Sequence, residues 1–321
     1  MSNLDLLEPK TRIFIESLSG TTPLYKLTPT DARQVLLDIQ KDTTYKSTVD
    51  IEDITVPSFA SGKTPNIPVK IFRPKNNREI LPVIIYCHGG GWVLGNSQTH
   101  GRLMSLLANG INAAVVYIDY TPAPEENFPI QIIQANQVLK YIAANGAKHK
   151  LDTNRLTVMG DSVGGNMATI ITLMAVQNKT PKITCLVLLY PVTDASMDTV
   201  SYYKYETGPW LSKAAMEWFF DQYVTEDMRQ LELVSPINTP SKNLEAYPPT
   251  LIVYGENDPL ASEVEAYSHL LITAGVDVAA VKFLGTIHDF LILDPLKDTP
   301  ATKEAMTLII AYVKNKFDKK N

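Results

Sequence analysis

Six continuous apolar runs in the middle and second half of the chain limit the folds that it can adopt. They are LPVIIYC (81–87), AAVVYID (113–119), RLTVMG (155–160), ITCLVLLY (183–190), TLIVYG (250–255) and VAAVKFL (278–284). Such runs, without alternating polar residues, are typical of parallel strands that are covered on both faces. Helix-length segments at 128–147 and 262–275 lie between them, and the first repeats its apolar residues at roughly helical spacing. The alternation predicts an α/β fold with a mainly parallel central sheet flanked by helices.

Three parts of the chain depart from this alternation. The runs at 49–57 and 67–74, with turn residues between them, predict an antiparallel pair at one edge of the sheet. Residues 1–45 show a helical pattern before any strand, and residues 195–240 form an insertion rich in Tyr, Trp and Phe. We expect the insertion to form a lid over the strand ends, although ordinary helix packing would use the same aromatic residues. The α/β core is then expected at 46–194 and 241–321.

Charge and composition exclude several classes of function. The net charge is −5 and no polybasic segment is present, which argues against nucleic-acid partners and stable membrane association. The start, MSNLDLLEPK, lacks the features of a signal peptide, and no apolar run reaches membrane-spanning length. Cys87 and Cys185 lie in apolar runs and are interpreted as buried thiols rather than a disulfide or metal pair. We therefore expect a cytoplasmic protein.

The segment LTVMGDSVGGNMATIITLMA (156–175) predicts a strand, a tight turn and a helix, with Ser162 at the turn. It contains the nucleophile-elbow pattern Gly-x-Ser-x-Gly in the structural context that this pattern requires. Only glycine at positions 160 and 164 would let the neighbouring chain pass so closely. The turn would raise the hydroxyl above the sheet at a helix N-terminus, where the helix dipole favours negative charge. Ser162 is therefore the predicted nucleophile, and a simple helix N-cap is the alternative.

A serine nucleophile needs a base, which is usually a histidine held by a carboxylate. In this fold the order along the chain is serine, acid, histidine, so that His269 and His288 are the only candidates among five histidines. His269 lies within a predicted helix. His288 comes just past the last predicted strand, where a loop can place it over the sheet. His288 is therefore the predicted base.

The predicted acid is Asp258, in the loop that follows the run TLIVYG. Glu256 and Asp289 compete for this role. Glu256 falls closer to the strand, and Asp289 adjoins His288 in sequence, which makes it difficult for its carboxylate to face the imidazole ring. Pro259 restricts the loop at Asp258. An Asx-turn is the alternative role for this aspartate.

Three consecutive glycines in CHGGGWVLG (87–95) follow a predicted strand, although each glycine raises the entropic cost of ordering the chain. Attack on an acyl carbon creates an oxyanion that needs fixed hydrogen-bond donors, and the absence of Cβ atoms would let a substrate carbonyl lie against the main chain. We predict an oxyanion hole at Gly89, Gly90, Gly91 and Val163, with the last three donating N–H groups. A ligand-free turn is one alternative. A phosphate loop is another, but the required glycine and lysine spacing is absent.

These motifs together resemble those of the bacterial hormone-sensitive-lipase-like esterases, which are α/β-hydrolases with an HGGG loop and a GDSxG elbow. The similar stretches run nearly end to end: LDLLEPKTRIFIESL, HGGGWVLGNSQTH, DYTPAPEENFP, GDSVGGN, LLYPVTD, ENDPLASEVEAY and GTIHDF. The resemblance implies the triad Ser162, Asp258 and His288, the oxyanion hole given above, and a cap built from the two helical segments. It also implies that His88 organises the glycine loop rather than serving as the base.

Three positions depart from the family pattern. Val163 stands in place of the usual alanine, Thr121 where arginine is often found, and Asp289 where glycine is common. Val163 keeps its N–H but crowds the oxyanion hole, and Asp289 adds a charge beside the base. We expect these departures to affect the substrate range and the pH profile rather than the reaction.

The resulting expectation is a serine carboxylesterase that hydrolyses short- to medium-chain acyl esters without a metal or another cofactor. Its partner would be a small-molecule ester, and the resemblance is compatible with a homodimer. Two other functions stay open. One is a ligand receptor on the same scaffold, as in the plant gibberellin receptors, which resemble this family but lack a working histidine. The other is hydrolysis of an amide, lactone or thioester by the same chemistry.

Overall fold

An eight-stranded sheet forms the centre of the computed structural model, which describes residues 4, 6–58 and 66–319. The strand order is β1-β2-β4-β3-β5-β6-β7-β8. The strands are β1 (Val49–Val56), β2 (Ile67–Pro74), β3 (Leu81–Cys87), β4 (Ala114–Ile118), β5 (Leu151–Asp161), β6 (Cys185–Leu189), β7 (Thr250–Asn257) and β8 (Val278–Ile287). β2 pairs antiparallel with β1 and β4, and every other pairing is parallel. The predicted mainly parallel sheet with an antiparallel edge is confirmed.

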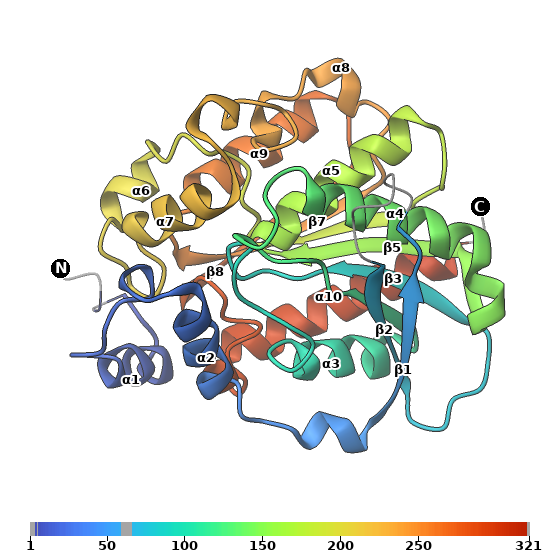
Figure 1. Ribbon diagram of the computed structural model, residues 1–321, viewed down its shortest axis with the longest axis horizontal. Coiled ribbons are helices and arrows are strands. Elements are labelled where there is room, and N and C mark those ends of the chain that lie inside the picture. Colours follow the sequence, from blue (N-terminus) through green and yellow to red (C-terminus); the bar gives the residue numbers. More distant parts are fainter. Residues whose placement is uncertain (1–3, 5, 59–65, 320–321) are drawn as a thin grey trace.

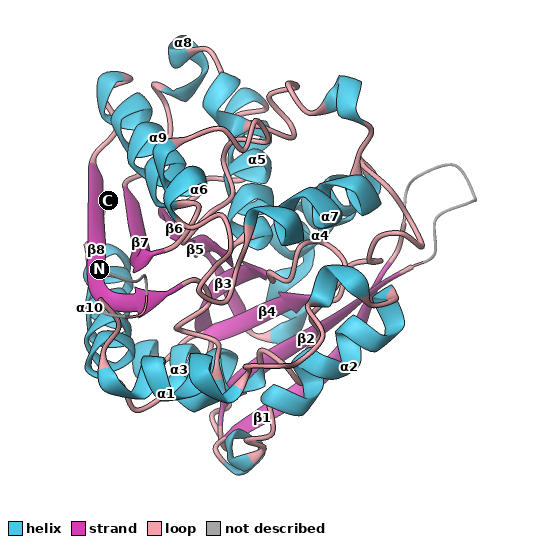
Figure 2. Ribbon diagram, turned by 90° about the vertical axis from the view of Figure 1, so that its left-hand side faces the viewer, coloured by secondary structure: helices cyan, strands magenta, loops and turns pink. Residues whose placement is uncertain are grey.

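Helices cover both faces of this sheet (Figures 1 and 2). One face carries α3 (Gly101–Ile111) and α10 (Pro300–Asp318), and the other carries α4 (Ile130–Asn145), α5 (Val163–Gln177) and α9 (Ala261–Thr273). All residues of β3, β4 and β6 are buried between these layers, which explains why their sequences are uninterrupted apolar runs. Within the part of the chain that the structure describes, no helix is both long and apolar enough to cross a bilayer.

The last strand differs from the prediction that all six apolar runs are covered on both faces. Most residues of β8 are exposed or half-buried, and the side chain of Leu284 is 70% exposed. β8 lies at the end of the strand order, so it has a neighbouring strand on one side only. The helices that flank the sheet therefore cover this edge only partly.

Four further helices lie at one end of the sheet, at the left of Figure 1. They are α1 (Pro9–Ser17) and α2 (Pro29–Ile39) from the N-terminal segment, and α6 (Val200–Lys204) and α7 (Lys213–Tyr223) from the insertion. The two segments meet, because the ring of Phe14 in α1 packs against that of Trp210 at a centroid distance of 5.6 Å. The elements expected to form a cap therefore lie together, whereas the boundaries at 45, 195 and 240 stay predictions.

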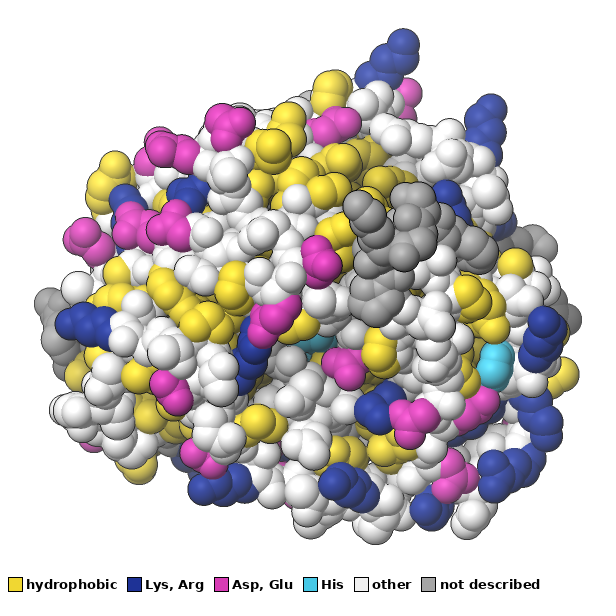
Figure 3. Space-filling model, in the orientation of Figure 1, with side chains coloured by type: hydrophobic (Ala, Val, Ile, Leu, Met, Phe, Trp, Pro, Cys, Tyr) yellow, Lys and Arg dark blue, Asp and Glu magenta, His cyan; other side chains and the backbone are white. Residues whose placement is uncertain are grey.

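The surface and the cysteines agree with an ordinary globular chain. Positive and negative side chains are interspersed on the face shown in Figure 3. Cys87 in β3 and Cys185 in β6 are both buried, free thiols, as predicted. Burial raises the pKa of both thiols, and it raises that of Cys185 to about 11. Neither thiol therefore has the low pKa that makes a cysteine reactive.

The turn from β5 into α5 depends on two glycines, as the sequence predicts. A Cβ atom on Gly164 would lie 2.1 Å from the carbonyl oxygen of Cys87, at the end of β3. A Cβ atom on Gly160 would lie 2.2 Å from the carbonyl oxygen of Gly164. These obstacles are backbone atoms, which cannot rotate away as a side chain can. The first turn of α5 therefore passes directly over the end of the central strand.

We expect Gly164→Ala to lower the free energy of unfolding by at least about 3 kcal/mol, because the added methyl group overpacks against backbone. Gly275→Ala is the control, since its Cβ atom would meet no atom within 4 Å although φ is +86°. That variant should lose only about 1–2 kcal/mol through the left-handed conformation. Urea denaturation of both variants and the parent measures the difference. Equal losses in the two variants would contradict the crowding that we describe.

Candidate active site

Ser162 lies at the turn between β5 and α5 in a strained backbone conformation, with φ 53° and ψ −122°. A residue with a side chain rarely adopts such a positive φ, and the strain costs about 1–3 kcal/mol. The surrounding main chain enforces it, since the N–H of Ser162 donates to the carbonyl of Leu189 at 2.8 Å and its carbonyl accepts from the N–H of Val192 at 3.1 Å. The hydroxyl is thereby held at the N-terminal end of α5.

The structure brings Ser162, His288 and Asp258 into one hydrogen-bonded chain. Nε2 of His288 lies 2.9 Å from Oγ of Ser162, and Nδ1 lies 2.7 Å from Oδ2 of Asp258. All three side chains are buried, with 5%, 2% and 0% exposure for Ser162, His288 and Asp258. Oδ1 of Asp258 also accepts the N–H of Leu260 at 2.8 Å. The aspartate therefore holds its own loop with one oxygen and the imidazole with the other.

The competing residues lie elsewhere or face other groups. His269 is exposed on α9 and is not one of the residues in this chain of hydrogen bonds. Oε2 of Glu256 accepts the N–H of Gly285 at 3.0 Å. Asp289 does approach His288, but on the other side of the ring, with its Oδ1 3.4 Å from Nε2. Its Oδ2 accepts the indole N–H of Trp210 at 2.9 Å, so this carboxylate joins the base to the insertion.

The charges around His288 raise its basicity. Burial by itself lowers the pKa of an imidazole, because a buried cation loses its hydration. The nearby carboxylates of Asp258 and Asp289 outweigh this effect and raise the pKa of His288 to about 9. Burial in turn raises the pKa of Asp289, which His288 and the Trp210 hydrogen bond only partly offset. The site therefore favours the imidazolium form more strongly than water does.

The glycine loop corrects one part of the predicted oxyanion hole. The N–H of Gly89 donates to Oδ1 of Asp161 at 3.0 Å, so it is not available to a substrate. The N–H groups of Gly90 and Gly91 have no hydrogen-bond partner among the described residues. Both of these glycines line the same cavity as Ser162. The donors that remain in this loop are therefore Gly90 and Gly91, while Gly89 anchors the loop.

The physical reason for three consecutive glycines also differs from the expectation. A Cβ atom on Gly90 would lie 2.6 Å from the carbonyl oxygen of Leu94, and one on Gly91 would lie 2.0 Å from the ring of Phe219 in α7. Both glycines have positive φ angles, of +103° and +65°. The protein itself, rather than a substrate alone, excludes the side chains. Phe219 thus places the insertion directly against the glycine loop.

A buried polar cluster that the sequence reasoning did not identify lies behind this loop. Oδ1 of Asp161 accepts the hydroxyl of Tyr86 at 2.8 Å, and Oδ2 lies 3.3 Å from Nε2 of His100. Burial opposes ionisation of Asp161, but His100 and Tyr86 outweigh it and lower its pKa. His88 stacks on Tyr120 at a centroid distance of 4.2 Å, and burial lowers the pKa of His88 to about 3. Asp161 lies in the motif GDSVGGN and His100 lies in the motif HGGGWVLGNSQTH. Their places in these two family-like motifs were the only sequence signal for this cluster.

The loop with Thr121, where the family often has arginine, is supported in another way. The N–H of Thr121 donates to Oε1 of Gln134 at 2.8 Å, and the hydroxyl oxygen of Thr121 accepts from Nε2 of Gln134 at 3.0 Å. Its carbonyl also accepts from Gln131 at 3.0 Å. Arg33 of α2 donates to the carbonyl of Ala123 at 3.0 Å. Two glutamines of α4 and one arginine of the N-terminal segment therefore stabilise this loop.

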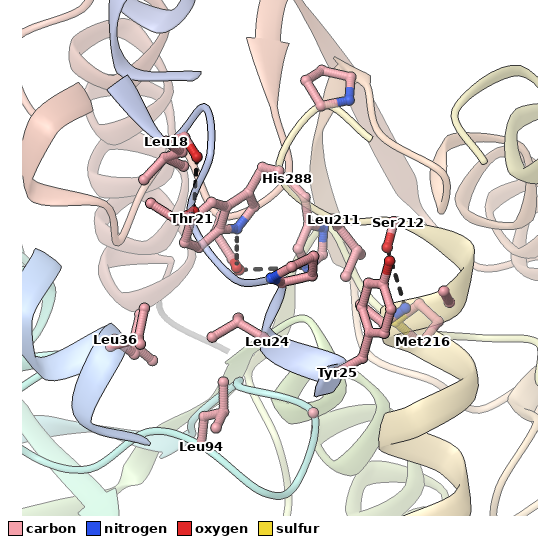
Figure 4. Close-up of a pocket in the computed structure, with 18 of the residues that line it drawn as sticks. Leu18, Thr21, Leu24, Tyr25, Leu36, Leu94, Leu211, Ser212, Met216 and His288 are labelled. Atoms are coloured by element: carbon pink, nitrogen blue, oxygen red, sulfur yellow. Dashed lines mark hydrogen bonds and ion pairs between the residues drawn. The ribbon is translucent and has the colours of Figure 1, made fainter. Parts of the chain in front are cut away.

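An apolar cavity of about 1360 Å³ opens above the hydrogen-bonded chain, with Ser162, His288, Gly90 and Gly91 in its wall. Figure 4 shows His288 between side chains of the N-terminal segment and of the insertion. The apolar wall of the cavity includes Leu18, Leu24, Tyr25, Leu36, Leu94, Leu211 and Met216. A cavity of this size holds a small organic ligand, for which roughly 300–1,000 Å³ is usual. Among the described residues, no group of three or more His, Cys, Asp or Glu side chains is arranged to hold a metal ion.

Comparison with known proteins gives consistent results. A thermostable esterase from Pseudomonas putida ECU1011 has a solved structure that is 38% identical to this chain, with a TM-score of 0.94 and coverage of 98% of this chain and 99% of that one. An ethyl acetate hydrolase from Pseudomonas putida is 34% identical over 229 residues, which are 70% of this chain and 71% of that protein. A relative from Acanthamoeba polyphaga mimivirus is 44% identical over 310 residues, covering 96% and 88%, and its name gives the fold without a substrate.

The family comparison covers the site itself. Residues 84–292 match the family described as having the alpha/beta hydrolase fold. This range includes the glycine loop, the elbow and His288. The chain therefore belongs to the α/β-hydrolase fold family, in its hormone-sensitive-lipase-like branch.

Proposed function

We propose that this protein is a serine carboxylesterase that hydrolyses short- to medium-chain acyl esters through an acyl-enzyme intermediate. The observation that carries the proposal is the hydrogen-bonded chain of Ser162, His288 and Asp258. Ser162 and His288 share a cavity with Gly90 and Gly91, whose N–H groups have no partner in the described part of the chain. Nucleophile, base, orienting acid and oxyanion donors are the complete set of groups that acyl transfer requires. The esterase names of the relatives support the same reaction.

In acylation, Oγ of Ser162 attacks the ester carbonyl carbon while Nε2 of His288 accepts the hydroxyl proton. The carbonyl oxygen becomes an oxyanion, which the N–H groups of Gly90, Gly91 and Val163 stabilise. Asp258 keeps Nδ1 of His288 protonated and stabilises the imidazolium cation. His288 then gives its proton to the alkoxy oxygen, the C–O bond breaks, and the alcohol leaves. The acyl group remains on Ser162.

In deacylation, a water molecule takes the place of the alcohol and His288 accepts one of its protons. The hydroxide attacks the acyl carbon, and the same N–H groups stabilise the second oxyanion. Collapse of this intermediate breaks the bond to Oγ, which recovers its proton from His288. The products are a carboxylic acid and the free enzyme. The apolar cavity wall favours substrates with alkyl or aryl groups over strongly polar ones.

The remaining parts of the proposal concern partners and location. The named residues complete the reaction without a metal or organic cofactor. The free, buried thiols of Cys87 and Cys185 are compatible with a reducing cytoplasm. A homodimer stays a prediction that an oligomeric-state measurement would test. An amide substrate needs stronger protonation of its leaving nitrogen, and an ester does not, so the ester is the favoured substrate.

We expect Ser162→Ala to lower kcat/KM for p-nitrophenyl butyrate by about 10⁴-fold or more, since the variant lacks the nucleophile. Because the serine side chain is small and its removal leaves the fold intact, the variant should unfold at a temperature close to that of the parent. Steady-state kinetics and thermal denaturation test both statements. A folded variant that still turns over the ester at the parental rate would refute the proposed function. A parent that only binds esters would favour the receptor alternative.

We expect kcat/KM to rise with pH and to reach half its maximum near pH 9. His288 has a pKa raised to about 9 and accepts the serine proton only when it is neutral, so activity is lost as the pH falls below this value. Asp289→Asn removes one of the charges that raise this pKa, so it should move the midpoint to lower pH. The measurement is a pH profile corrected for spontaneous hydrolysis.

Asp227→Asn is the matched control for this profile, because Asp227 is exposed in a short helix of the insertion. It removes the same charge from the chain at a position that does not line the cavity. Its midpoint should equal that of the parent. A midpoint for Asp289→Asn that stays in place or moves to higher pH would show that Asp289 does not raise the basicity of His288.

A further inference from the structure

We propose that Gln40 is a positioning residue for the active site. It joins the N-terminal segment to the segment that follows the glycine loop and to the segment that follows His288. It immediately follows α2, and its side chain is buried, with 7% exposure. Its Nε2 donates to the carbonyls of Thr99 and Ile292, and its Oε1 accepts the N–H of Asp294 at 2.8 Å. One amide therefore satisfies three backbone groups on two segments. This inference rests on the proposed esterase function.

On one side, Gln40 holds the segment that follows the base. The N–H of Ile292 donates to the carbonyl of Asp289 at 2.9 Å, which makes a tight turn directly after His288. The carbonyl of Ile292 accepts from Gln40 and also from Arg102 of α3 at 2.8 Å. Arg102 donates in addition to Oδ1 of Asp294 at 2.8 Å. The turn that follows His288 is thus attached at Ile292, which is four residues after the histidine.

On the other side, Gln40 holds the end of the glycine-loop segment. Its bond to the carbonyl of Thr99 is 2.9 Å long, and Thr99 contacts Nδ1 of His100 through its hydroxyl, also at 2.9 Å. His100 contacts Asp161, whose other oxygen accepts the N–H of Gly89. A continuous series of polar contacts therefore leads from Gln40 to the anchor of the glycine loop. Asp161 is also the residue immediately before the nucleophile.

Gln40 lies outside the cavity wall, so a change at this residue tests the positioning of the catalytic groups rather than direct contact with substrate. Its neighbours Asp38 and Ile39 line the cavity, whereas Gln40 does not. Within the described residues, the carbonyl of Thr99 accepts a hydrogen bond from Gln40 alone. Loss of this amide would release Thr99 and would leave Ile292 with Arg102 only. Of the three residues that Gln40 holds, Ile292 lines the cavity, whereas Thr99 and Asp294 do not. We therefore expect the loss to disturb the geometry between His288, Ser162 and the glycine loop more than it disturbs the cavity wall.

The experiment compares Gln40→Met, which keeps the length of the side chain without its polar atoms, with Gln34→Met. Gln34 is exposed on α2, the helix that Gln40 follows, and among the described residues its side chain bonds to Asp38 alone. We expect Gln40→Met to lower kcat for p-nitrophenyl butyrate by about 10- to 100-fold, the effect of a small misplacement of reacting groups. Its KM should stay within about twofold of that of the parent. Gln34→Met should match the parent in both constants.

Each rate is divided by the concentration of reactive serine, titrated with a fluorophosphonate, so that an unfolded fraction does not lower the apparent kcat. Gln40→Glu is measured alongside, because it keeps Oε1 and loses both donors; a loss of kcat in this variant at parental KM also supports the proposal. Parental kcat per titrated serine in the two variants would overturn it, as would a change confined to KM. A parent without esterase activity would instead refute the proposed function.

Discussion

The close passage of α5 over the end of β3 is the constraint on which the active site depends. A Cβ atom on Gly164 would lie 2.1 Å from the carbonyl oxygen of Cys87 and 2.6 Å from the carbonyl carbon of His88. The same crossing therefore sets the start of α5, with Ser162 before it, and the start of the glycine loop, which begins at His88. Nucleophile and oxyanion donors come close together because two backbone segments are packed without side chains between them. The strain at Ser162 is the energetic consequence of this packing.

Three buried or half-buried carboxylates surround this crossing, and each is held by donors of the protein. Asp161 accepts hydrogen bonds from the hydroxyl of Tyr86 and the N–H of Gly89. Asp258 accepts from the N–H of Leu260 and pairs with the imidazole of His288. Asp289 accepts from the indole N–H of Trp210. Two of them raise the pKa of the imidazole most strongly, which stabilises the cation that forms in the transition state. The same charges reduce the neutral fraction of His288 at pH 7. The site thus gains base strength, while a smaller fraction of His288 is in the reactive neutral form in neutral solution.

The sequence was most informative where one local segment determines the structure. The elbow at Ser162 needs only a strand, a turn and two glycines, all within a few residues, and the structure has β5 and α5 on either side of this serine. The order of elements likewise predicted the sheet and placed His288 past its last strand. Asp258 was predicted on loop position and on competition with Glu256, which the structure pairs with Gly285 instead. These choices required no knowledge of contacts between distant segments.

Contacts between distant segments account for what the sequence could not predict. The bond between Gln40 and Ile292 joins residues 252 positions apart, and a buried glutamine after a helix has no sequence pattern of its own. Gly89 was included in the predicted oxyanion hole because the glycine motif does not show that its N–H is bonded to Asp161. The exposure of β8 followed from its place at the edge of the sheet, which an apolar run does not reveal. In each case the deciding partner lies on another element of the fold.

The N-terminal segment supports the site as well as covering it, and this limits how a substrate enters. Arg33 donates to the carbonyl of Val93 at 2.7 Å, next to the glycine loop, and Gln40 holds the segment after His288. Lifting α2 would break both attachments and disturb the groups that perform the chemistry. The rim at 18–27 lines the same cavity, and the backbone hydrogen bonds described for it stay within residues 15–27. Displacing this rim would break none of the attachments that Arg33 and Gln40 make, so that the rim of the cavity and the catalytic geometry depend on different parts of one segment.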